Sequence, residues 1–267
     1  MYITYLGTAA AEGAPAIFCN CEHCRYARTV GGKEIRMRSG ALIDGKLKLD
    51  FGPDAYAQSL RFNISYVPVN HVLITHSHFD HFTVNDLKCI CPPYSHREQP
   101  LHVYGDAKVR GMIEPHLKEG LLEFTEVKPF TTYHIDEYDV TPLEAVHAIG
   151  QGEEPLFYLI EKDGRRLLYM HDTDLPTEAD MAFLKDKRMD LISMDCTNGI
   201  LNPDYIGHMG IEDNLKLREM LIANGTADEN TTFVANHFSH NGLAPYEELE
   251  KRLPGFRVTY DGLTLMV

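Results

Sequence analysis

The stretch His76-Ser77-His78-Phe79-Asp80-His81 places four side chains that commonly bind metals within six residues. It follows directly on the apolar run 71–75, which is typical of a β-strand. Alternate side chains of an extended chain point to the same side, so His76 and His78 can share one ion. If the chain then turns, Asp80 and His81 are directed toward a neighbouring point. The spacing therefore predicts two adjacent metal ions at the carboxyl end of a strand.

The rest of the chain alternates short apolar runs with a few helical patterns. Residues 39–54 predict a β-hairpin, because the turn pair Asp44-Gly45 separates two alternating apolar stretches. Helical periodicity is clearest over 211–223 and 246–253, and residues 89–102 resemble a loop. No Pro/Gly/Ser-rich linker divides the sequence. We therefore expect an α/β fold in a single domain, 1–267. The remaining expected strands are 101–104, 140–146, 156–160, 167–170, 191–194 and 232–235.

The histidine stretch carries an HxHxDH motif and resembles the metallo-β-lactamase superfamily. Other short segments support the same resemblance: LGT at 6–8, the hairpin ending in DFGPD, YMHDT at 169–173 and NHFSH at 236–240. The resemblance implies a four-layer αββα sandwich with the metals at one rim of its two sheets. The remaining ligands should then lie at later strand ends.

The resemblance assigns those later ligands to three further residues. His147 corresponds to the third histidine of the first metal site, and Asp172 corresponds to the aspartate that bridges the two ions. His171 and Asp174 compete with Asp172 for that position. His237 corresponds to the final ligand. The implied dinuclear set is His76, His78, Asp80, His81, His147, Asp172 and His237.

A second cluster, Cys19-Asn20-Cys21-Glu22-His23-Cys24, forms an N-terminal cysteine-rich loop at about 19–24. Its CxC and CxxC spacings allow three thiolates to converge on one tetrahedral ion, and free or redox-active thiols are the alternative. With this cluster the resemblance narrows to the PhnP-like phosphodiesterase branch, in which the fourth ligand of a structural zinc is a histidine three residues beyond the last catalytic one. That position is His240, with His23 as a local rival. The pair Cys89 and Cys91 receives no metal role, and neither does Cys196.

His208, before the helix expected at 211–223, resembles an additional active-site histidine of that branch. It could bind a phosphoryl oxygen or protonate the leaving group, or it could simply be a loop or helix-capping residue. Asp80 is counted as catalytic as well as metal-binding. Asp195 is either a carboxylate that orients a histidine ligand or a structurally buried one.

Composition limits the class of substrate. The chain has 25 Lys+Arg against 39 Asp+Glu, a formal charge of −14, which opposes binding of a long polyanion. No apolar run is long enough to span a membrane and no signal peptide is visible, so we expect a cytoplasmic protein. The expected partner is a small phosphodiester, with no long nucleic acid and no membrane. A homodimer is left open.

Together these features predict a metal-dependent hydrolase that cleaves a small, perhaps cyclic, phosphodiester through a metal-bridging hydroxide. The cofactors would be two divalent ions, Mn or Zn or also Fe, and one structural Zn. Four alternatives stay open: an RNase Z-like nuclease, a lactone or thioester hydrolase, a PqqB-like pathway protein, and a metal-binding scaffold without turnover.

Overall fold

Two seven-stranded sheets form the centre of the protein. The computed structural model describes residues 1–147, 150, 152–203 and 206–267. The first sheet has the order β14 (Thr264–Met266), β1 (Tyr2–Gly7), β2 (Gly40–Ile43), β3 (Leu47–Leu49), β4 (His71–Leu73), β5 (Leu101–Gly105), β6 (Leu122–Glu126). The second has the order β13 (Phe256–Val258), β12 (Thr232–Asn236), β11 (Leu191–Asp195), β10 (Arg165–Met170), β9 (Leu156–Lys162), β8 (Tyr138–Glu144), β7 (Tyr133–Ile135).

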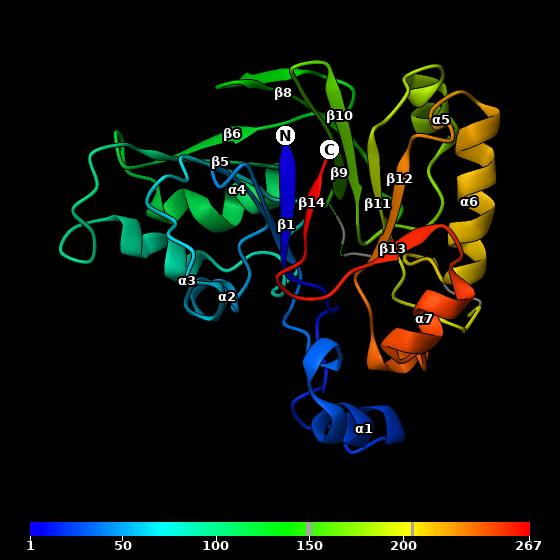
Figure 1. The fold of residues 1–267 in the computed structure, drawn as a ribbon. Coiled ribbons are helices and arrows are strands. Elements are labelled where there is room, and N and C mark those ends of the chain that lie inside the picture. Colours follow the sequence, from blue (N-terminus) through cyan, green and yellow to red (C-terminus); the bar gives the residue numbers. More distant parts are fainter. Residues whose placement is uncertain (148–149, 151, 204–205) are drawn as a thin grey trace.

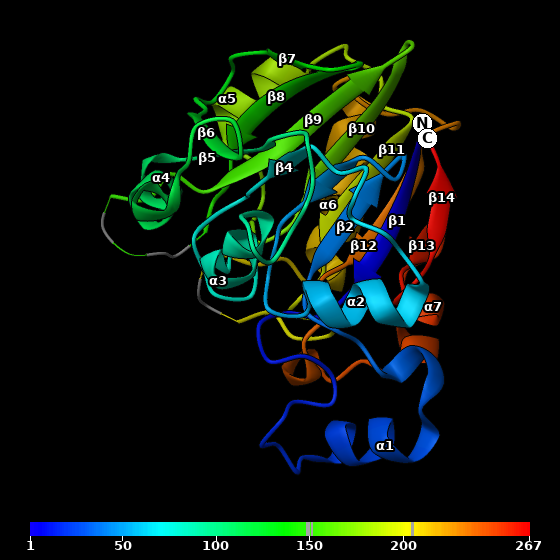
Figure 2. The same cartoon turned by 90° about the vertical axis from the view of Figure 1, so that its left-hand side faces the viewer.

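Helices cover the outer faces of both sheets (Figure 1). The helices are α1 (Glu22–Val30), α2 (Ala55–Phe62), α3 (Val84–Leu87), α4 (Ala107–Ile113), α5 (Glu178–Leu184), α6 (Ile211–Ala223) and α7 (Tyr246–Arg252). Helices α2, α3 and α4 lie on the side of the first sheet, and α5, α6 and α7 lie on the side of the second, while α1 projects from one end in both views (Figures 1 and 2). The expected αββα sandwich is therefore confirmed.

Three apolar clusters correspond to the three contacts between these layers. Residues such as Tyr5, Leu73 and Tyr169 fill the space between the sheets. Leu217 of α6 packs with the outward side chains of the second sheet, and Val109 of α4 packs with those of the first. Both faces of each sheet are thus buried, as the near-continuous apolar runs of the central strands require.

The predicted hairpin forms as expected. Strands β2 and β3 pair antiparallel, and Asp44 and Gly45 have φ angles of 49° and 71°, the left-handed conformation that a tight hairpin turn needs. The two long helical patterns become α6 and α7. Helices α1, α2, α4 and α5 were not predicted, because in these short segments the apolar residues form no clear helical period. Within the described residues, no helix combines the length and hydropathy needed to span a bilayer.

Candidate metal centres

The ends of several strands meet at one edge of the sandwich and bring the expected ligands together. In the second sheet β10, β11 and β12 run parallel, so their carboxyl ends lie at the same edge. Asp172 follows β10 and His237 follows β12 directly, while His76 follows β4 of the first sheet closely. His147 stands in the loop after β8, which ends at Glu144. The two sheets thus supply ligands to one site.

His76, His78 and His147 form the first group of possible ligands. One ring nitrogen from each lies within 4.8 Å of the others. His147 Nε2 is 3.3 Å from His78 Nδ1, and the rings of His76 and His78 meet edge to face with centroids 4.6 Å apart. Three imidazoles that point at one place are suited to a zinc or similar transition metal ion.

Asp80, His81 and His237 form the second group, and Asp172 lies between the two groups. Asp172 Oδ2 is 2.9 Å from both His81 Nε2 and His237 Nε2. Its other oxygen, Oδ1, is 3.8 Å from His147 Nε2 in the first group. One carboxylate with an oxygen toward each group has the geometry of a bridging ligand.

The ring nitrogens that face away from the site have partners in the protein. His81 Nδ1 donates to Asp50 Oδ2 at 2.7 Å, and His147 Nδ1 donates to the carbonyl oxygen of Gly207 at 2.9 Å. His76 Nδ1 lies 3.0 Å from the Thr75 hydroxyl, and His237 Nδ1 lies 2.8 Å from the Thr197 hydroxyl. These contacts fix the rings so that the Nε2 atoms of these histidines face inward.

The inward atoms are the ones that lack ordinary hydrogen bonds. Among the described residues, His76 Nε2, His81 Nε2, His237 Nε2 and Asp172 Oδ2 are buried without a hydrogen bond of good geometry, although Asp172 Oδ2 is close to two of these nitrogens. Burying unpaired polar atoms is costly, and several of them directed at one point are compensated by a cation. The residues present therefore fit the pair of divalent ions that the sequence predicts.

The backbone is unusual at three residues of this site. Asp50, Asp172 and His237 have φ angles of 56°, 50° and 61°, in the left-handed region that non-glycine residues seldom occupy. Such conformations concentrate at functional sites because the surrounding structure must hold them. At Asp172 and His237 the turn comes directly after a strand and directs the side chain into the site.

The rivals of Asp172 have other partners. His171 is fully buried beneath the site, and its Nε2 lies 2.8 Å from the Ser193 hydroxyl. Burial lowers the pKa of His171 to about 3, so the ring is neutral. Asp174 accepts a hydrogen bond from the backbone N–H of Leu175. Of the three side chains, the structure places Asp172 between the ligand groups.

His208 lies beside the ligand groups. Its Nδ1 donates to Asp195 Oδ2 at 3.0 Å, and its ring centroid is 4.9 Å from that of His147. Burial alone would lower the pKa of His208, but the Asp195 carboxylate outweighs it and the pKa is raised. Asp195 also accepts from the backbone N–H of Asp172 and lies 3.4 Å from His237 Nδ1. Of the two interpretations of Asp195, the contacts favour the orienting one.

A cavity of about 440 Å³ opens onto these residues. Its wall includes the ligands His78, Asp80, His147, Asp172 and His237, together with His208. The rest of the wall is formed by Ala10, Ala11, Glu12, Thr197, Asn198, Leu201, Pro203, Ser239, Asn241 and Gly242. The volume suits a small organic molecule.

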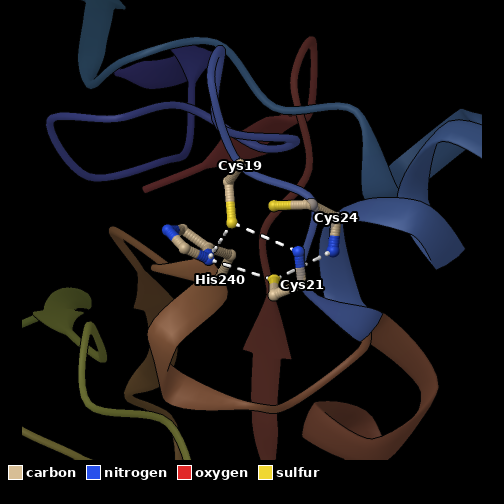
Figure 3. Close-up of side chains that lie close together, drawn as sticks. All are labelled: Cys19, Cys21, Cys24 and His240. Atoms are coloured by element: carbon tan, nitrogen blue, oxygen red, sulfur yellow. Dashed lines mark hydrogen bonds between the residues drawn. The ribbon is translucent and has the colours of Figure 1, made fainter.

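The cysteine loop forms the second centre (Figure 3). Cys19, Cys21, Cys24 and His240 each offer a ligand atom within 4.8 Å of the others. His240 Nδ1 is 3.4 Å from Cys21 Sγ and 3.7 Å from Cys19 Sγ. Three thiolates and one imidazole match a closed, tetrahedral zinc site. His23 is not part of this group of four, so the structure favours His240 as the fourth ligand.

Local structure explains how the cysteines gather. Helix α1 begins right after Cys21, whose sulfur accepts the backbone N–H of Cys24 at 3.4 Å. The first turn of the helix therefore brings Cys24 back over Cys21.

Cys196 instead packs in an apolar cluster beside α6 and α7, and Cys89 is exposed.

Comparison with known proteins agrees with this architecture. A sequence model of the beta-lactamase superfamily domain matches residues 47–227, more than half of the chain. The chain belongs to the metallo-β-lactamase superfamily. Members of this superfamily are metal-dependent hydrolases, and the resemblance inferred from the motifs is confirmed. No curated protein matches the sequence significantly.

Solved structures share the fold of this superfamily member over its whole length. A diphosphatase of the PhnP family is 23% identical with a TM-score of 0.77, covering 100% of this chain and 97% of its own. Zinc-bound PqqB from Methylobacterium extorquens is 19% identical with a TM-score of 0.77, covering 100% of both chains. The short form of human tRNase Z is 17% identical with a TM-score of 0.67, covering 100% of this chain and 99% of its own. At these identities the likeness establishes the fold alone.

Proposed function

We propose that this protein is a dinuclear metal-dependent hydrolase that cleaves a small phosphodiester. One observation carries the proposal: His208, hydrogen-bonded to Asp195, lies in the same cavity wall as the two groups of metal-ligating side chains. A proton donor beside a centre that binds cations and water is the arrangement needed to expel an alkoxide from phosphorus.

The metal-ligating residues would hold two divalent ions. His76, His78 and His147 would bind one divalent ion, Asp80, His81 and His237 a second, and Asp172 both. When bound, such ions lower the pKa of water and neutralise charge on a phosphoryl group. Imidazole and carboxylate ligands accept Mn, Zn or Fe, whereas the cysteine cluster favours Zn.

His208 is the residue we assign to protonate the leaving group. Its Nδ1–H is held by Asp195, so its Nε2 is the atom free to give a proton to the substrate. The Asp195 carboxylate raises the pKa of His208 and so favours the protonated form of the ring. Asp195 is a positioning residue, since it orients His208 and supports the protonated form.

The substrate class follows from charge and size. The chain carries a formal charge of −14, which disfavours a long nucleic acid, and the cavity of about 440 Å³ fits a small molecule. Two of the structural neighbours, a diphosphatase and a tRNase, act on phosphate compounds, which is consistent with phosphoryl chemistry here. We therefore favour a small diester over RNA.

A four-substrate assay tests this proposal. The metal-reconstituted protein is offered bis(p-nitrophenyl) phosphate, p-nitrophenyl phosphate, a lactone and a thioester, beside a His78→Ala variant. We expect turnover of the diester that disappears in the variant. Turnover of the lactone or thioester alone would refute the phosphodiester assignment and keep a hydrolase. Inactivity toward all four would favour a metal-binding scaffold.

A further inference from the structure

We propose that Glu12 selects the substrate: its carboxylate accepts a hydrogen bond from a hydroxyl group on the part of the diester that does not react, and it repels a second phosphate. The inference rests on the proposed phosphodiesterase function and adds to it. It names the substrate class as a hydroxylated, otherwise uncharged phosphodiester.

Glu12 is held in the cavity wall by contacts to one of its two oxygens. It sits in a turn after β1 that is closed by a hydrogen bond from Gly13 N to Ala10 O. Glu12 Oε1 accepts from the Ser239 hydroxyl and lies 3.6 Å from His240 Nε2. Among the described residues, none donates to Oε2. The side chain is 30% exposed and lines the cavity that contains Asp172 and His208. One oxygen is thus fixed while the other remains available to a ligand.

The described wall of the cavity offers no lysine or arginine to a second phosphate. The five residues that the structure does not describe are Ala148, Ile149, Gln151, Asp204 and Tyr205, none of which is basic.

Arg38, which contacts Ala11 of this wall, has other partners. Arg38 Nε donates to the carbonyl of Ala11, and Arg38 Nη1 pairs with Asp54 at 2.9 Å. Its charge is therefore compensated outside the cavity. Beyond the metal-ligating groups, Glu12 is the negatively charged side chain of the described wall, and a substrate with a second anionic group would be repelled by it.

The groups around Glu12 suit hydroxyls. Asn241 lines the same cavity and carries an amide group, whereas the hydroxyls of Ser239 and Thr197 there are already bonded to Glu12 and to His237. A hydroxyl both donates and accepts, so it can give its hydrogen to Glu12 and accept from a neighbouring side chain. A site that binds a hydroxyl in this way discriminates strongly against an analogue that lacks it, because a charged acceptor is then left without its partner.

Three diesters with a common leaving group test the inference. Each is a p-nitrophenyl phosphodiester whose second ester group is ethyl, 2,3-dihydroxypropyl or 2-phosphonoethyl, so differences in kcat/KM report that group alone. We expect the dihydroxypropyl ester to exceed the ethyl ester by about tenfold or more and the phosphonate ester to be the poorest substrate, in line with a hydrogen bond to a charged acceptor.

Two substitutions of Glu12 distinguish a role in substrate selection from a role in stabilising the fold. Glu12→Gln keeps an acceptor for Ser239 and should lose most of the preference for the dihydroxypropyl ester. Glu12→Lys should raise kcat/KM for the phosphonate ester by about tenfold. Glu229→Lys, the same charge change at an exposed loop position, is the matched control and should change none of the ratios. Zinc content is measured in each variant, because Glu12 is near His240.

The outcomes distinguish this inference from the function on which it rests. If no diester is hydrolysed, including bis(p-nitrophenyl) phosphate, the proposed function fails. If the ethyl ester is turned over but the three esters react alike, or if both Glu12 variants lower all three equally, the function stands and the role of Glu12 is refuted.

Discussion

The histidine–aspartate site and the cysteine cluster differ in how deeply their ligands are buried and in how many protein contacts hold them. His76, His81 and His237 are no more than 1% exposed and stand in segments that follow strands of both sheets. Cys19 and Cys21 are partly exposed and belong to one short loop. The outward nitrogens of the histidines are held by protein groups, whereas the sulfurs of Cys19 and Cys21 accept only a few backbone N–H groups besides facing His240. Strands position the first site, and the cysteine site depends more on its ion for order.

The largest effect is expected from the bridging aspartate. Asp172→Asn should lower kcat/KM for the diester by more than about 100-fold, beyond the loss typical of residues that only orient a ligand. The fold should persist, because the substitution leaves the apolar clusters that join the layers unchanged. Steady-state kinetics and thermal unfolding followed by circular dichroism measure both effects.

Asp174→Asn is the matched control for this experiment. Its carboxylate accepts from the backbone next to it rather than facing the site. Equal losses in the two variants would contradict the bridging geometry.

The next effect concerns His208. His208→Gln should lower kcat by about 10²–10⁴ for a diester with an alkyl leaving group, the range typical of a lost general acid. With p-nitrophenolate, which leaves without a proton, the loss should be much smaller. His134→Gln, an exposed histidine of β7, serves as the control. A loss that is the same for both leaving groups would indicate a structural role instead.

The cysteine cluster should affect stability more than chemistry. Cys21→Ser should release the zinc of this cluster and lower Tm by at least about 5 °C, since a bound ion stabilises the folded state. Activity should fall far less than in Asp172→Asn. Metal analysis and calorimetry test this, and Cys89→Ser should change neither quantity. Retention of zinc in Cys21→Ser would remove Cys21 from the ligand set.

The smallest effect is a difference in thiol reactivity within that cluster. The backbone N–H of Cys24 is the main cause of the lowered pKa of Cys21, about 6, whereas burial raises the pKa of Cys24 to about 11. As pH rises through 6, Cys21 should become a thiolate while Cys24 stays protonated. In protein stripped of metal, alkylation at pH 7 followed by mass spectrometry should modify Cys21 well before Cys24. Preferential modification of Cys24 would reverse this order.

The expected ligands within the two cysteine and histidine motifs follow from local spacing, whereas His147, Asp172, His237 and His240 were assigned from the resemblance to the superfamily. HxHxDH and CxCxxC each occupy six residues, so chemistry and spacing are read together. The residues that orient the ligands form no local motif in the sequence. Asp50 lies 31 residues from His81, and Thr197 lies 40 residues from His237, and only the strand register brings each pair together.

Some other features could be identified only from the three-dimensional structure. The left-handed backbone of Asp172 and His237 cannot be read from residue types that rarely adopt it. The choice between His240 and His23 depended on where the loop after β12 meets the cysteines. Glu12 was not predicted from the sequence, because a single carboxylate in a loop forms no recognisable motif.

The contact between Cys21 and His240 also has a consequence during synthesis. The two residues are separated by 219 positions. At typical elongation rates His240 is added roughly ten to forty seconds after Cys21. The three cysteines thus emerge from the ribosome long before their fourth ligand, and the cluster can close only after β12 has been made. An ion bound by these four residues would therefore join two segments that are synthesised far apart in time, the loop before α1 and the segment after β12.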